Sequence, residues 1–172
     1  MFESTDSWGD ADQTRKDTQG GTFLRLKEGE ECELVFPKQP FGFRQVWLQS
    51  ENRSEIYDPA KHDGLRPSGR FAFPVFVLQG EQWAPQLFQA SGEAYDEIRE
   101  AIEEDGPACL YRLRRKGAGK ETKYRVKMLR KLTDGEVETL RGKQLVDAEA
   151  IVMGREDDPA TDMPEGKDPW GE

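Results

Sequence analysis

The sequence predicts a mainly β fold, namely an OB-type Greek-key barrel with one helix before the last hairpin. Two patterns favour this fold: several short runs alternate between apolar and polar residues, and one amphipathic helical run precedes the final two of them. Composition agrees, because 172 residues with 35% hydrophobic side chains favour one domain with polar ends. Parallel winding is not expected, since only one firm helix separates strands.

Both ends of the chain are predicted to lie outside the packed domain. Residues 1–21 lack hydrophobic periodicity and are rich in Ser, Thr, Asp, Gln and Gly, which predicts a disordered N-terminal arm. Residues 147–172 hold nine acidic and two basic side chains, which predicts a disordered acidic C-terminal tail. The folded domain is therefore expected to span residues 22–146.

The first five strands are predicted from alternation and from turn residues at their ends. In the fourth of them, Pro74 predicts an edge or a bulge. In the third, Val46 and Leu48 share one face, so Trp47 lies on the other. These strands are expected at residues 22–27, 30–36, 43–49, 70–78 and 86–90.

A helix is predicted between an N-cap at Ser91 and a stop at Gly106-Pro107, because apolar residues recur there at helical spacing. Two further strands, residues 109–116 and 122–131, are expected to form the last hairpin. Thr133 and Glu136 form a capping box, which predicts a second short helix ending near Leu145.

Charge is distributed unevenly along the chain. The net charge is −9, yet residues 107–131 hold ten basic and one acidic side chain. A phosphate backbone responds to such a local field, so overall acidity does not exclude a nucleic-acid partner. The alternative is that this basic stretch pairs with acidic segments of the same chain.

Period-two alternation separates an apolar row from a basic row on both hairpin strands. Like charges gathered on one face repel one another, which favours an anionic ligand or the acidic tail there; a solvated outer face is the alternative. The cations expected to contact phosphates are Arg112, Arg114, Lys116, Lys123, Arg125 and Lys127, with Lys120 in the connecting loop.

Aromatic side chains outside the core would complete a single-strand site, because rings stack on any base with about 1–3 kcal/mol each. Trp47 is the first candidate, since it lies opposite Val46 and Leu48. Phe43, Tyr57 and Phe73 are further stacking candidates, and Arg44 is a nearby cation.

Catalysis, metal binding and cofactors are not expected. Cys32 and Cys109 lie far apart and His62 is the single histidine, so no zinc site can be assembled. No nucleophile motif is present, and the glycine loop 117–120 lacks the Walker spacing. No apolar run approaches the roughly 20 residues that span a bilayer, and the cysteine usage favours a reducing, cytoplasmic setting.

The C-terminus resembles a short peptide ligand. Trp170 can fill a pocket on a partner, while Asp168 and Glu172 can meet basic residues around it. A tail that only improves solubility is the alternative.

Four pieces of the sequence together resemble the phage single-stranded DNA-binding proteins, an OB-fold family of helix-destabilising proteins. They are the opening run 23–29, the run 70–77, the hairpin 113–126 and the acidic tail with its aromatic residue near the end. The resemblance covers residues 22–131 and the tail. It implies coating of single-stranded DNA without sequence preference during phage DNA replication, recombination and repair in the infected host cell.

The family also implies that the tail recruits phage replication proteins and competes with DNA for the binding groove. Some relatives carry a structural zinc, which this chain cannot supply. The typical tail of the family ends on its aromatic residue, whereas Gly171 and Glu172 follow Trp170 here. A homodimer or a cooperative assembly on DNA is left open. The alternative function is a protein–protein interaction module that docks on host polymerase or another replication or transcription protein.

Overall fold

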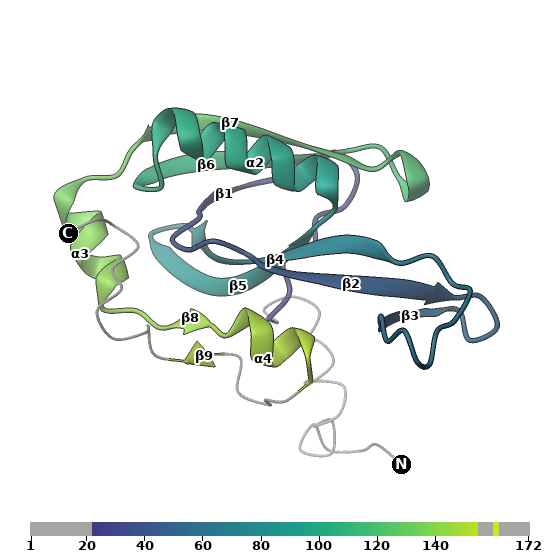
Figure 1. Cartoon of the computed structure of the whole chain (residues 1–172). Coiled ribbons are helices and arrows are strands. Elements are labelled where there is room, and N and C mark those ends of the chain that lie inside the picture. The colour runs from purple at the N-terminus through teal and green to yellow at the C-terminus, as the bar shows by residue number, and fades with distance from the viewer. Residues whose placement is uncertain (1–21, 155–159, 162–172) are drawn as a thin grey trace, which may run out of the picture.

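The structure, a computed structural model, describes residues 22–154 and 160–161. The fold is mainly β, with an antiparallel sheet in the order β3-β2-β4-β1-β6-β7, and β5 paired with β4 off this path (Figure 1). The predicted N-terminal arm, and the tail residues 155–159 and 162–172, lie outside the described residues. The strands of this sheet are β1 Glu31–Val35, β2 Phe41–Leu48, β3 Arg53–Ile56, β4 Ser68–Gln79, β5 Gln82–Ala90, β6 Cys109–Lys116 and β7 Lys123–Lys131.

The remaining elements follow the sheet strands or connect them. They are α2 Gly92–Asp105, the 3₁₀ turn η2 Gly119–Glu121, α3 Asp134–Arg141, β8 Leu145–Val146, α4 Ala148–Val152 and β9 Ala160–Thr161. The Ser91 side chain accepts a hydrogen bond from the Ala94 N–H, so the predicted N-cap of α2 is confirmed.

Strand β4 is the centre of the sheet. It pairs with β5 along its length, while its other side pairs first with β2 and then with β1. Pro74 lies between Ala72, where the pairing with β2 ends, and Phe76, where the pairing with β1 begins. The expected edge position is therefore wrong: β4 is central, and its proline stands where one side of the strand changes partner.

The main core lies between the sheet strands and α2, which packs along β7 (Figure 1). Phe36 packs edge-on against Phe73 and at a tilt against Tyr111. From the helix, Ala94 and Ile98 enter the same core. Each large apolar side chain buried this way contributes about 1.5–3 kcal/mol.

The segment predicted as a first strand at residues 22–27 forms only an isolated parallel bridge. The Leu24 N–H donates to the Leu87 carbonyl at 2.9 Å, and the Leu87 N–H donates to the Thr22 carbonyl at 2.6 Å. Leu26 continues into the main core. The alternation was therefore a sign of one buried side chain and one bridge rather than of a full strand.

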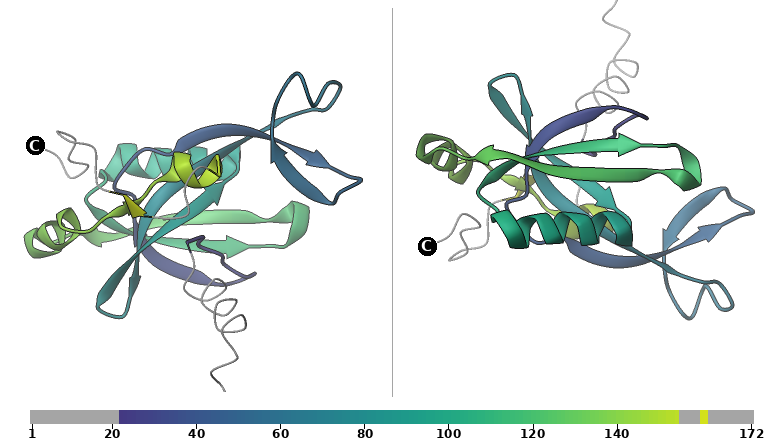
Figure 2. Two further views of the ribbon diagram at one scale, coloured as in Figure 1. Left: turned by 90° about the horizontal axis from the view of Figure 1, so that it is seen from below. Right: turned by 90° about the horizontal axis from the view of Figure 1, so that it is seen from above.

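The domain extends beyond residue 146, so the predicted start of the tail at residue 147 is wrong. Val146 and Ala148 are buried against Ala72 and Leu87, on the face of β4 and β5 that points away from the main core. Seen from below, β8 and α4 lie across these strands (Figure 2). The Asp147 side chain caps α4 by accepting from the Ala150 N–H.

The predicted capping box at the start of α3 is also confirmed. Thr133 Oγ1 accepts from the Glu136 N–H, and the Glu136 carboxylate accepts from the Thr133 N–H. Arg130 adds a forked pair, with its two terminal nitrogens 2.6 and 3.0 Å from the two Glu136 oxygens. This hydrogen bonding from Arg130 lowers the pKa of Glu136 from 4.5 to about 2.

Replacing Glu136 with Gln should lower the free energy of unfolding by about 1 kcal/mol near neutral pH, because the forked pair with Arg130 loses its charge. The folded-state pKa lies below the unfolded-state value, so the contribution is present above about pH 4.5 and is lost as pH falls toward 2. Urea unfolding of both proteins across this range should show the difference shrinking. Glu138→Gln, on the exposed face of α3, is the matched control, and a pH-independent difference would contradict the assignment.

Candidate nucleic-acid interface

The β6–β7 hairpin carries the basic residues on its outer face, as the alternation predicts. Tyr111 and Leu113 are buried in the main core, and Val126 and Met128 pack against it. The intervening residues form three cross-strand pairs of like charge: Arg112 with Lys127, Arg114 with Arg125, and Lys116 with Lys123. These six residues are called the cationic strip below.

Directly opposed like charges destabilise a hairpin, so the cationic strip is held by the burial of the residues between its members. Two carboxylates form long ion pairs with residues of the strip. Glu31 lies 3.6 Å from Arg112, and Glu97 lies 3.7 Å from Arg125. Both pairs are long and partly exposed, so they weaken the positive field of the strip without removing it.

The Arg115 side chain points away from the cationic strip and stabilises the hairpin tip through hydrogen bonds. One terminal nitrogen donates to the Leu26 carbonyl at 2.7 Å and the other to the Thr122 hydroxyl at 3.3 Å. Its backbone also bonds to Gly29 and Glu30. Lys120 lies in η2 at the tip, and the structure does not describe its side chain.

Strand β2 holds three of the predicted site residues, and its alternation places Arg44 on the face opposite Phe43 and Trp47. As expected, Val46 is buried, and Trp47 is 55% exposed. Arg44 is exposed as well, but it lies three positions before Trp47 and therefore points to the other side of the strand. Phe43 is half-buried, stacks on Phe41 and packs against the cluster under α4, so it is not a free stacking platform.

The prediction that Phe73 stacks on a base is wrong. Its ring is 2% exposed and belongs to the main core, where no base can reach it. The alternation along β4 places Phe71 and Phe73 on the same face of the strand. Phe71, closer to the start of β4, is partly exposed, whereas Phe73 is buried.

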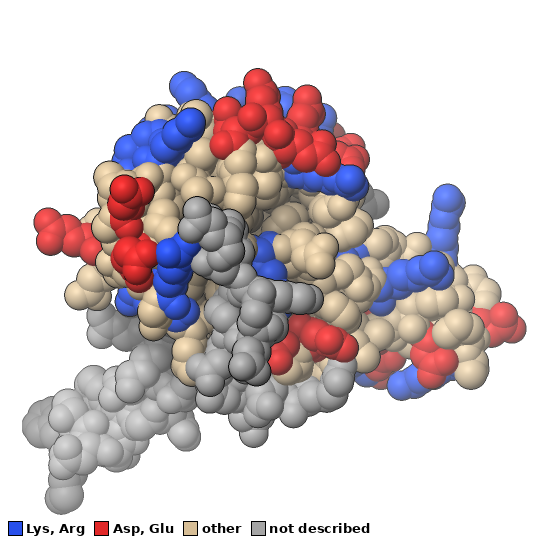
Figure 3. Space-filling view, turned by 60° about the vertical axis from the view of Figure 1, so that its left-hand side comes forward, with Lys and Arg blue, Asp and Glu red and all other residues tan. Residues whose placement is uncertain are grey.

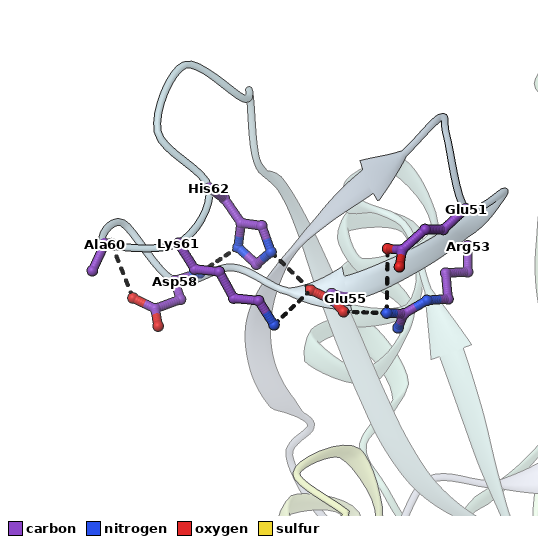
Figure 4. A network of polar contacts seen from close by, with 7 residues as sticks. All are labelled: Glu51, Arg53, Glu55, Asp58, Ala60, Lys61 and His62. Carbon is purple, nitrogen blue, oxygen red and sulfur yellow. Dashed lines mark hydrogen bonds and ion pairs between the residues drawn. The ribbon is translucent and has the colours of Figure 1, made fainter.

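Tyr57 belongs to the loop between β3 and β4, where its half-buried ring stacks on His62. The His62 Nδ1 accepts from the Asp58 N–H at 3.0 Å, so Nε2 carries the proton and donates to Glu55 at 2.9 Å (Figure 4). This hydrogen bond from His62, followed by those from Arg53, lowers the pKa of Glu55. His62 is therefore a buried structural residue that holds this loop against β3.

The structure brings the cationic strip together and keeps Trp47 apart from it. The two lie on separate hairpins, β6–β7 and β2–β3, which project from the same side of the molecule (Figures 1 and 2). Within the described residues no group of three or more His, Cys, Asp or Glu could hold a metal ion, and no helix is long and apolar enough to cross a membrane. Asp168, Trp170 and Glu172 lie outside the described residues.

One aromatic feature was not among the predicted site residues. Phe71 stacks on Tyr95 of α2, with ring centroids 4.1 Å apart, and the pair lines a groove of about 550 Å³ with Lys38 and Gly42. In the sequence Phe71 is one aromatic residue among many, and only the packing of α2 on β4 reveals the pair.

No family model, curated protein or solved structure matches the chain significantly.

Gly117 is expected to be required at the hairpin tip. Its φ is +76°, and a Cβ there would collide with the backbone carbonyl of Glu121. Gly117→Ala should therefore lower the free energy of unfolding by about 1–3 kcal/mol. Gly119 has a φ of +57° and open space around it, so Gly119→Ala should have a smaller effect. Urea unfolding measures both, and equal effects would contradict this tip geometry.

Proposed function

We propose that this protein binds single-stranded DNA without sequence preference and without catalysing a reaction. The observation that carries the proposal is the cationic strip, three directly opposed pairs of cations on one exposed face. Such a face is unfavourable for the isolated protein and favourable next to phosphates, because each contact releases counterions from the nucleic acid.

The strand connections support an OB-type barrel. β1 and β2 together correspond to the first strand of such a barrel, β4 and β5 to the second and third, and β6 and β7 to the fourth and fifth. α2 falls between the third and fourth strands. Between β5 and β7 the rings of Phe88 and Tyr124 meet edge to face, 5.0 Å apart, which supports a partly open barrel.

The strip, rather than the outer face of β4 and β5, is the proposed phosphate site. OB-folds commonly bind oligonucleotides on their second and third strands. Here Val146 and Ala148 cover the corresponding face at Ala72 and Leu87. The cationic strip has no such cover among the described residues, and it alone combines a high density of cations with exposure.

Trp47 supplies a stacking platform on the second hairpin, and Arg44 a cation on the opposite face of the same strand. A base that stacks on Trp47 would add about 1–3 kcal/mol regardless of its identity. To use both sites, a bound strand would have to extend from the strip to the second hairpin, which projects from the same side of the molecule (Figure 1).

In its biological role the protein would coat single-stranded DNA during phage replication, recombination and repair, as the resemblance of the hairpin and tail implies. The tail residues Asp168, Trp170 and Glu172 would recruit replication proteins and compete with DNA for the strip. A module that docks on host polymerase is the alternative. Co-purification of a host protein without a gel shift of single-stranded DNA would favour it.

A fluorescence titration with oligo(dT) at several salt concentrations tests DNA binding. If about five phosphates are neutralised, log affinity should fall against log salt with a slope near −3.5. Arg114→Gln with Arg125→Gln should weaken binding and reduce that slope by about 1.4. Arg141→Gln, on α3 away from the strip, is the control and should change neither quantity. A flat salt response would rule out the proposal.

Deleting residues 162–172 tests the tail. This segment carries four acidic residues and one lysine, so its removal should raise affinity for single-stranded DNA, most at low salt. The deletion must not begin at residue 147, because the loss of Ala148 would uncover Ala72 and Leu87 and destabilise the domain. Unchanged affinity at low salt would remove tail competition from the account.

A further inference from the structure

Carboxylates border the cationic strip along β1. In the sheet, Glu31 is the partner of Arg114 and Glu33 the partner of Arg112. Residues directly opposite each other in an antiparallel pair point to the same face, so both carboxylates lie on the face of the strip. Glu31 is exposed and Glu33 half-buried.

A second acidic border lies beyond β7. No further strand pairs with this side of β7 among the described residues; instead α2 packs along it. Glu93 and Glu97 of α2 line a small cleft together with Lys123 and Arg125 of β7. Figure 3 shows acidic side chains gathered at the top of the molecule, where α2 lies in Figure 1.

The strip between these borders is only two strands wide. Neighbouring strands lie about 4.8 Å apart, so the line between β6 and β7 is about 7 Å from β1. One phosphate backbone that runs along this line would meet cations on both sides. A second backbone beside it would lie over carboxylates.

We infer that Glu31, Glu33 and Glu97 make the cationic strip selective for single-stranded over double-stranded nucleic acid, an inference that rests on the proposed function. A duplex presents its two backbones across grooves of about 6–12 Å. When one backbone lies on the strip, a second backbone across the narrower groove falls beside it, over β1 or toward α2. Duplex DNA also has twice the charge of one strand per unit length, so the repulsion from these borders increases with the second backbone.

The ion pairs of Glu31 and Glu97 contribute little to the stability of the fold. The Glu31–Arg112 and Glu97–Arg125 pairs are long and partly exposed, and such pairs add little to stability. Substitution by Gln keeps the shape and removes the charge. The variants are therefore expected to fold, and thermal unfolding followed by circular dichroism verifies this.

The experiment compares a single-stranded oligo(dT) and a blunt duplex of the same length, in the same buffer, by fluorescence titration. Glu31→Gln with Glu33→Gln should raise duplex affinity about tenfold and single-strand affinity about threefold or less, since the border charges face the second backbone. Glu97→Gln should shift the ratio in the same direction from the other side. Glu138→Gln, an exposed and ion-paired carboxylate on α3, is the control and should leave the ratio unchanged.

The result separates the inference from the proposed function. If Arg114→Gln with Arg125→Gln leaves single-strand binding unchanged, the strip is not the DNA site and the proposed function fails. If that variant weakens binding, but the Gln variants of the borders raise both affinities equally or raise neither, the strip stands and the selectivity inference is overturned.

Discussion

The register of the β6–β7 hairpin is the constraint on which the proposed site depends. Tyr111 and Leu113 have to face the core, and the period of two then sends Arg112 and Arg114 to solvent. A slip by one residue would bury arginines and expose the apolar row, so the burial of one row maintains the exposure of the other. The energy that holds six like charges together is therefore hydrophobic and comes from the opposite face of the same strands.

The sheet order extends this constraint to the borders of the strip. Because β1 lies between β4 and β6, Leu34 has to enter the core, and its neighbours Glu31 and Glu33 then lie in register with the arginines of β6. Packing of α2 on the other side positions Glu97 near Arg125. The same packing that builds the sheet and seats α2 therefore also places the carboxylates to which the proposed selectivity is assigned.

Local patterns in the sequence were sufficient for the features that depend on neighbouring residues. The Ser91 cap, the Thr133 capping box and the outward position of Trp47 all follow from residues within one element. Features that depend on distant residues were missed. The acidic composition after Asp147 gave no sign that Ala148 is buried against Leu87. The sequence alone did not distinguish the buried Phe73 from the exposed Trp47, because this difference depends on how β4 packs. The two acidic borders likewise required the strand order, which alternation alone does not specify.

The acidity of the chain has two separate consequences for an anionic ligand. If the tail carboxylates compete with DNA as proposed, they would oppose single strands and duplexes alike through their overall charge. Carboxylates on β1 and α2 are fixed beside the strip, so their effect depends on where the ligand's second backbone lies. Salt weakens both by screening, over about 8–10 Å near physiological ionic strength. Under these two proposals only the carboxylates of β1 and α2 would distinguish a duplex from a single strand, whereas the tail would change the affinity for both together.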